Sequence, residues 1–395
     1  MNPQMDDHTK SPKSKGPRNR AAFVAVAVAL CAAACSSGNT SSSPTTTPDS
    51  ATSIATASCV AKANKFLQPY RNIPTSLPSS FVRLSKPPTP GGTIIRIADG
   101  NIPSDVATFQ ATSAAAKAIG WTAKLIVENG TVEDIDAKWQ EAVADKPTAI
   151  VGAGNPASML QQPIAAAKAA GIVVGLDNVT DTATSYPGLA AVESGTAVNQ
   201  LFGQIHANLL MSESGCHADV GIFSLPFPIF NAVTDSFQAA LKANCPQCKA
   251  SLHLIQTADI GSPAATNEVV SALQADPSMK WVFTPTADVA DGLPAALSQA
   301  NITGVKIFGG GSPDQNTIKM LQDGASSWWL EVGAPINGWL EVDAVLRAID
   351  AHGPVTTTSA PLAILTPQNV GQDTTNPPVY PTNYQQLFEQ VWGVG

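Results

Sequence analysis

The sequence predicts an α/β protein built as two successive lobes, each with an open parallel sheet covered by helices on both faces. From Gly92 onward, short uninterrupted apolar segments alternate with amphipathic segments, as parallel strands and their crossover helices do. The same alternation starts again at the segment ADVGIFSL. A chain of 395 residues also exceeds what one hydrophobic core usually organises, which favours two lobes.

The first half carries the elements of one lobe. Its predicted strands are 93–99, 122–129, 149–154 and 172–178, and its predicted helices are 107–120, 132–145 and 159–171. The helix over 132–145 places Ile135, Trp139 and Val143 on one face, and Gly120 and Gly171 end the other two.

The second half repeats this order. Its predicted strands are 218–225, 249–256, 281–286 and 305–311, and its predicted helices are 231–244, 265–276 and 292–301. Open α/β sheets bind their ligands at the carboxyl ends of the strands, so the loops after these strands are where a site is expected.

The N-terminus is predicted to be a lipoprotein signal peptide, residues 1–34. A basic stretch precedes fourteen small or apolar residues, which are too few to span a membrane comfortably. The sequence Ala32-Ala33-Ala34-Cys35 resembles a lipobox, although such motifs usually have Leu where this chain has Ala32. We therefore expect Cys35 to carry a lipid on the outer face of the bacterial cytoplasmic membrane; an ordinary secreted protein is the alternative.

Residues 35–90 are expected to be a lipidated N-terminus and a Ser/Thr/Pro-rich linker, with 36–58 disordered because so few of its residues can be buried. The predicted signal carries five basic and two acidic residues, so its removal would change the net charge from −8 to about −11. This acidity argues against nucleic-acid binding. No later segment is long and apolar enough to span a membrane.

Four cysteines remain after the signal and the lipid site: Cys59, Cys216, Cys245 and Cys248. Outside the cytoplasm they are expected to form disulfides, and the sequence does not choose among the three pairings. The motif CPQC allows redox or zinc chemistry as an alternative. It follows a predicted helix instead of starting one, which favours a structural disulfide.

Motifs for catalysis and cofactor binding are missing from the sequence. The segment GAGNP has no third glycine in register for a dinucleotide site, and there is no nucleophile elbow and no Walker loop. Histidines are scattered without the spacing of metal ligands. We expect no enzyme activity, no cofactor and no metal; a secreted hydrolase is the remote alternative.

Several segments in this order resemble the periplasmic sugar-binding proteins of ABC importers, in their lipoprotein form. They are VADKPTAIVGAGNPASMLQQPIAAAKAAGIVVGLDN, FNAVTDSFQAALKA, ADPSMKWVFTPTADVADGLPAALSQA, VKIFGGGSPDQNTIKMLQDG and the tail TNYQQLFEQVWGVG. The resemblance covers about residues 91–395. It implies the ribose-binding-like, type I periplasmic-binding-protein fold, in which two Rossmann-like lobes are joined by a three-segment hinge.

The resemblance also implies domain boundaries. Lobe one is expected at 91–192 plus 336–360, and lobe two at 193–332 plus 363–395. The chain is expected to cross between the lobes near 190–193, 331–335 and 360–365.

A ligand is then expected between the lobes. The candidate ligand-binding residues are Asn101, Asp105, Asn155, Asp177, Asn178, Phe227, Asn231, Thr286, Asp288, Trp328 and Glu331. Amide and carboxylate groups pair with hydroxyls, and flat aromatic faces pack on the C–H side of such ligands. Asn155 as a helix cap, Asn231 as an ordinary helix residue and Trp328 as hinge packing remain open alternatives.

Three positions depart from the family pattern. An Arg common in pentose and hexose binders is replaced by Asn231, an Asn-Asp pair by Thr286-Ala287, and a strand-end Asp by Gly310. Fewer charge-assisted hydrogen bonds favour a ligand less polar than an aldose, such as a polyol or a deoxy sugar.

The predicted function is that of a monomeric solute-binding lipoprotein of an ABC importer. It would close by hinge motion on a small neutral solute and deliver it to a membrane permease. A nucleoside-binding lipoprotein with a ligand stacked between Phe227 and Trp328, and a sensor subunit for a membrane receptor, are the alternatives.

Overall fold

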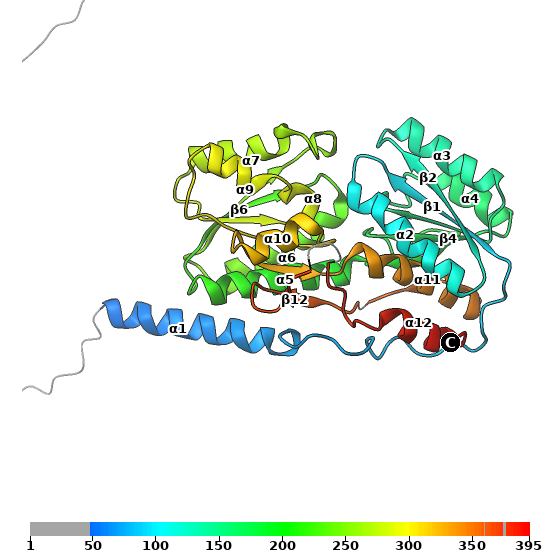
Figure 1. Ribbon diagram of the computed structural model, residues 1–395, viewed down its shortest axis with the longest axis horizontal. Coiled ribbons are helices and arrows are strands. Elements are labelled where there is room, and N and C mark those ends of the chain that lie inside the picture. Colours follow the sequence, from blue (N-terminus) through cyan, green and yellow to red (C-terminus); the bar gives the residue numbers. More distant parts are fainter. Residues whose placement is uncertain (1–47, 359, 374–376) are drawn as a thin grey trace, which may run out of the picture. The chain divides into compact units, whose positions relative to one another are not determined.

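Two six-stranded sheets organise the chain, as the alternation in the sequence predicts (Figure 1). In this computed structural model, residues 48–358, 360–373 and 377–395 are described. The predicted signal peptide and Cys35 lie outside them. No helix among the described residues is both long and apolar enough to cross a membrane.

Lobe one is built on a wholly parallel sheet in the order β11-β5-β4-β3-β1-β2. Its strands are β1 (Thr93–Asp99), β2 (Thr122–Glu128), β3 (Ala149–Ala153), β4 (Val173–Asp177), β5 (Leu189–Glu193) and β11 (Val355–Thr356). Its helices are α2 (Pro103–Ala118), α3 (Val132–Ala144), α4 (Gln161–Ala169) and α11 (Ala334–Asp350). Helix α2 packs on α11 at one face of the sheet, and α3 packs beside α4.

Lobe two has the order β12-β10-β9-β8-β6-β7, with β12 antiparallel to β10. Its strands are β6 (Asp219–Ser224), β7 (Lys249–Leu254), β8 (Trp281–Thr284), β9 (Lys306–Gly310), β10 (Ser326–Glu331) and β12 (Ala363–Leu365). Its helices are α5 (Thr196–Glu213), α6 (Pro228–Asn244), α7 (Pro263–Ala275), α8 (Ala287–Ala290), α9 (Leu293–Gln299) and α10 (Gln315–Gln322). Two 3₁₀ turns complete the elements, η1 (Gln68–Tyr70) and η2 (Thr257–Asp259).

The structure places all eight predicted strands and all six predicted helices within a few residues of their expected bounds. Helix α2 begins at Pro103, four residues before the predicted start, because proline suits the first helical position. Strand β5 was not predicted, since its five residues lie where the first hinge crossing was expected. The chain passes to lobe two only after Glu193, and it returns between Glu331 and Ala334.

The segment expected to be a linker is partly folded. Helix α1 (Pro48–Leu67) includes residues 48–58, which were expected to be disordered. Cys59, Ala63 and Leu67 recur every fourth residue and are buried, so α1 presents one apolar face to α5. A disulfide from Cys59 to Cys216 fixes α1 to lobe two.

After α1 the chain continues to lobe one (Figure 1). Arg347 Nη1 donates to the Val82 carbonyl at 2.9 Å, the Ser85 amide donates to Asp350 Oδ2 at 2.9 Å, and Trp121 Nε1 donates to the Thr89 carbonyl at 2.8 Å. Residues 48–90 therefore contact both lobes.

The C-terminal segment also differs from the expected division. Strand β12 joins the sheet of lobe two, but α12 (Tyr384–Trp392) packs against α11 of lobe one. The Trp392 ring stacks on Trp339 with centroids 5.2 Å apart, and its Nε1 donates to Asp343 Oδ1 at 2.8 Å. Burial of two large aromatic rings holds this helix on lobe one.

Candidate functional site

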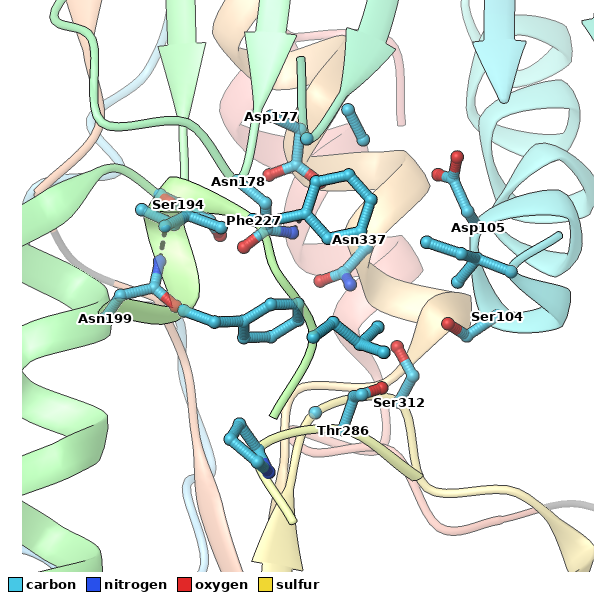
Figure 2. Close-up of a pocket in the computed structure, with 18 of the residues that line it drawn as sticks. Ser104, Asp105, Asp177, Asn178, Ser194, Asn199, Phe227, Thr286, Ser312 and Asn337 are labelled. Atoms are coloured by element: carbon cyan, nitrogen blue, oxygen red, sulfur yellow. Dashed lines mark hydrogen bonds between the residues drawn. The ribbon is translucent and has the colours of Figure 1, made fainter. Parts of the chain in front are cut away.

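A cavity lies between the lobes where the carboxyl ends of both sets of parallel strands meet. The volume of this cavity that the centre of a water molecule can reach is about 130 Å³. A single bound water needs roughly 10–15 Å³ of such volume. The cavity therefore has room for a small solute. Figure 2 shows Asp177 and Asn178 on one side of this space and Thr286 and Ser312 on the other.

The lobe-one wall is polar. Of the predicted residues, Asp105, Asn155, Asp177 and Asn178 line it. Asp177 and Asn178 end strand β4, and Asn178 has the left-handed backbone conformation, φ 51°, that Asn tolerates better than most residues. Its Nδ2 donates to Asp177 Oδ2 at 3.0 Å.

Arg96 forms a buried ion network beneath this wall. Its side chain is 1% exposed, and Nη2 lies 2.7 Å from Asp105 Oδ1 and 3.0 Å from Glu341 Oε1. Arg96 Nε donates to both Glu341 oxygens at 3.1 Å, and Thr112 Oγ1 donates to Oε2 at 3.0 Å. Asp105 was predicted to contact the ligand. Both of its carboxylate oxygens already accept hydrogen bonds, one from Arg96 and one from the Asp99 amide.

Asp177 and Glu193 form a second buried group, at the ends of neighbouring strands β4 and β5. Burial, followed by the nearby Glu193 carboxylate, raises the pKa of Asp177 well above its ordinary value. Burial also raises the pKa of Glu193, while Asp177 and Ser194 partly offset that rise by hydrogen bonding. One proton shared by the two groups relieves the repulsion between two carboxylates at this depth.

The lobe-two wall is mostly apolar. The predicted Phe227 lines it together with Leu225, Ile229, Phe230, Val233 and Val332. The Phe227 ring also faces Gly154 of lobe one, where a Cβ would lie 3.5 Å from the ring. The predicted Thr286 and Asp288 supply polar groups at the edge of this wall.

Asp288 joins the two lobes directly. Its Oδ1 accepts from the Ser104 amide at 3.1 Å, and its Oδ2 accepts from Ser104 Oγ at 2.6 Å. Ser104 lies in the first turn of α2, whose amides have no partner in the preceding residues of the helix. A lobe-two carboxylate therefore caps a lobe-one helix across the cleft. These contacts exist only when the lobes are close together.

Four predicted residues lie outside the cavity wall. Asn231 is exposed on α6, because the wall is formed by the neighbouring Phe230 and Val233. Asn101 turns back to Asp99 and to the Asn129 carbonyl. Trp328 is buried beneath the wall, where it contacts His206, and Glu331 is buried at the hinge, where its Oε1 accepts from the Gly333 amide at 2.9 Å.

Sequence reasoning missed several wall residues. They are Arg96, Ser104, Ser194, Asn199, Phe202, His206 and Asn337. Asn337 has a buried Oδ1 with no hydrogen-bond partner among the described residues, as a ligand contact requires. Asn337 is the fourth residue of α11, after the chain has returned to lobe one. It does not follow a strand, so the rule that sites form at strand ends could not predict it. Gly310, which replaces an expected Asp, leaves the space that the His206 ring fills.

The four cysteines pair as Cys59–Cys216 and Cys245–Cys248. Among the described residues, the one group with the spacing of metal ligands is Cys59, Cys216 and Cys245. Their sulfurs are in disulfides, and a metal needs thiolates. The Cys245–Cys248 disulfide links the end of α6 to the start of β7, which agrees with a structural role.

Residues 101–353 match the family described as "Periplasmic binding protein domain". This match spans more than half of the chain, so the protein belongs to the periplasmic binding protein family. Members of this family bind solutes outside the cytoplasm and are not enzymes. No curated protein sequence matches the chain significantly.

Solved structures share the fold at low identity. An ABC sugar transporter subunit from Rhodobacter sphaeroides is 21% identical with a TM-score of 0.59, over 71% of this chain and 99% of that one. An ABC transporter solute-binding protein from Agrobacterium vitis, with bound allitol, is 19% identical with a TM-score of 0.60, over 71% and 97%. One from Clostridium phytofermentans, with bound L-rhamnose, is 16% identical with a TM-score of 0.60, over 71% and 97%.

Proposed function

We propose that this protein is the solute-binding component of an ABC importer and captures a small neutral, hydroxylated solute between its lobes. The observation that carries this is the interlobe cavity, in which a polar wall faces an apolar one at the strand ends. Similar structures hold a polyol and a deoxy sugar, which supports the ligand class. Hinge closure would bring both walls onto the solute, and a membrane permease would then receive it.

The Ser104–Asp288 contact supports the closing step. Its two hydrogen bonds join the lobes at the mouth of the cavity, which Ser104 and Asp288 both line. The alternative of a nucleoside stacked between Phe227 and Trp328 loses support, because Trp328 is buried outside the wall.

The test compares two asparagines at the same place in two helices. Asn337 is the fourth residue of α11 and lines the cavity, whereas Asn231 is the fourth residue of α6 and is exposed. Calorimetric titration of the full chain with sugars, polyols and nucleosides identifies a ligand. Asn337→Ala should then weaken its binding by about tenfold, as loss of a hydrogen bond in a closed site does.

Asn231→Ala should leave affinity unchanged in the same titrations. Equal affinity of both variants and the parent would remove Asn337 from the site. Failure of the parent to bind any sugar or polyol would overturn the proposed ligand class.

We further propose that the protein is attached to the outer face of the cytoplasmic membrane through a lipid on Cys35. The lipobox-like Ala32-Ala33-Ala34-Cys35 supports this. Metabolic labelling of expressing cells with an alkyne-tagged fatty acid should mark the parent and not Cys35→Ala. Equal labelling of both would contradict the proposal.

A further inference from the structure

His206 has an unusual position for a histidine that is 1% exposed. It lies in the middle of α5, and its ring borders the cavity on the lobe-two side. The ring packs on Phe283 with centroids 4.6 Å apart. Trp328 Nε1 donates a hydrogen bond to His206 Nδ1 at 3.2 Å, which holds the ring from below.

This hydrogen bond determines where the ring carries its proton. Indole nitrogen can only donate, so Nδ1 must accept and the proton of the neutral ring lies on Nε2. Burial lowers the pKa of His206 to about 3, so the ring stays neutral at physiological pH. His206 therefore presents one fixed N–H donor.

Nε2 lies beside a residue that has no side chain, Gly310. A Cβ on Gly310 would lie 2.7 Å from Nε2, so any other residue at 310 would collide with the ring. Gly310 and His206 both line the cavity. Among the described residues, the bond from Trp328 to Nδ1 is the one hydrogen bond that the His206 ring makes.

The lobe-two wall that carries this donor is mostly apolar. Leu225, Phe230, Val233 and Val332 line the same wall. A ligand group placed here needs an oxygen that accepts from Nε2 and, beside it, apolar surface. A hydroxyl in place of the apolar group would lose its hydrogen bonds to water and gain few in return, which costs affinity.

We propose that His206 is a specificity-determining residue that donates Nε2–H to a ligand oxygen, and that the ligand is a 6-deoxyhexose. This rests on the proposed function and narrows its ligand class. A 6-deoxyhexose carries a methyl group next to its ring oxygen. The methyl group packs on the apolar lobe-two wall, the ring oxygen accepts from His206, and the ring hydroxyls face the polar lobe-one wall.

The test titrates the full chain calorimetrically with two matched pairs, L-rhamnose against L-mannose and L-fucose against L-galactose. Members of each pair differ by one hydroxyl at carbon 6. At least one deoxy sugar should bind about fivefold or more tightly than its hydroxylated partner. A parent protein that binds each hydroxylated sugar as tightly as its partner overturns the deoxyhexose assignment.

Two variants test the residue itself. His206→Phe removes the donor and should weaken binding of the preferred deoxy sugar about five- to tenfold. His206→Gln supplies both an acceptor for Trp328 and an N–H donor, so it should stay within about threefold of the parent. Unchanged affinity in His206→Phe, with melting of the empty protein confirming a folded chain, overturns the role of His206.

Trp328 acts through His206 as a positioning residue, and its variant provides the test if His206→Phe does not fold. Trp328→Phe leaves Nδ1 without its donor, so affinity should fall less than in His206→Phe. Nitrogen-15 NMR of labelled histidine should show the Nε2–H tautomer in the parent and a mixture in this variant; the same tautomer in both overturns the argument. If the parent protein binds other polyols but none of the four sugars, the deoxyhexose assignment alone is overturned. If it binds no sugar or polyol, the proposed function is overturned as well.

Discussion

The two walls of the cavity differ in how they handle polar groups. In lobe one, the carboxylates of Asp105 and Glu341 pair with one buried cation, Arg96, and polar side chains dominate the wall. In lobe two, the wall is mostly apolar, with His206 as a neutral donor and Thr286 and Asp288 as further polar groups. A ligand held between such walls has to be polar on one side and apolar on the other.

The buried glutamates show the same difference. Glu341 of lobe one contacts Arg96 at 3.0 Å, whereas Glu331 of lobe two is 0% exposed and its Oε2 has no partner among the described residues. Burial raises the pKa of Glu341 to about 7, although Arg96 opposes the rise. Burial raises the pKa of Glu331 to about 8, opposed by amide hydrogen bonds alone. Arg96 therefore partly balances the charge of Glu341, whereas Glu331 is kept as the neutral acid up to a higher pH.

The largest expected effect comes from removing the cation of lobe one. Arg96→Met leaves Asp105 and Glu341 buried without their partner, and should lower the free energy of unfolding by about 3–5 kcal/mol. Urea unfolding measures it. Lys124→Met on the neighbouring strand β2 is the control, because its ion pairs are exposed and should matter little. Similar stability of both variants would mean that the buried network does not hold lobe one together.

The next effect is a pH dependence from lobe two. The unfolded chain releases the Glu331 proton near pH 4.5, while the folded protein keeps it to about pH 8. Stability should therefore fall as pH rises through this window, because the folded state binds the extra proton. Glu128 and Glu341, both raised to about 7, act in the same direction.

Glu331→Gln resembles the protonated acid at every pH. Between pH 5 and pH 8 the free energy of unfolding should therefore decrease by a few kcal/mol less in this variant than in the parent. Chemical unfolding at both pH values measures this, with the exposed Glu133→Gln as control. A pH dependence that is as steep in Glu331→Gln as in the parent would place the buried proton elsewhere.

The smallest effect concerns the apolar wall. Phe227→Ala should weaken ligand binding about tenfold, because the ring supplies apolar surface to the cavity and approaches Gly154 across it. Phe66→Ala, on α1 and away from the cavity, should bind like the parent. Calorimetric titration with the ligand that the parent protein binds measures both affinities. Unchanged affinity in Phe227→Ala would mean that the ligand contacts only the polar wall.

Local patterns gave correct predictions where the physics is local. Apolar runs marked the strands, and residues at the end of a strand, such as Asp177 and the following Asn178, lie at the cavity because parallel strands end at one edge. The same reasoning failed for Asn231, since a shift of one or two positions along a helix turns a side chain from the wall to solvent. It also failed for residues 48–58, which were expected to be disordered but form the start of helix α1, and that helix packs against α5.

The pattern of apolar and polar residues was enough to predict the two α/β lobes, the edge of each sheet where the cavity lies, and the absence of recognisable catalytic motifs. Three contacts could not be predicted in this way: the disulfide from Cys59 to Cys216, the ion pair of Arg96 with Glu341 and the approach of His206 to Gly310. These partners are 157, 245 and 104 positions apart in the chain. Periodicity records which face of an element is buried, but which distant side chain meets that face depends on how whole elements pack.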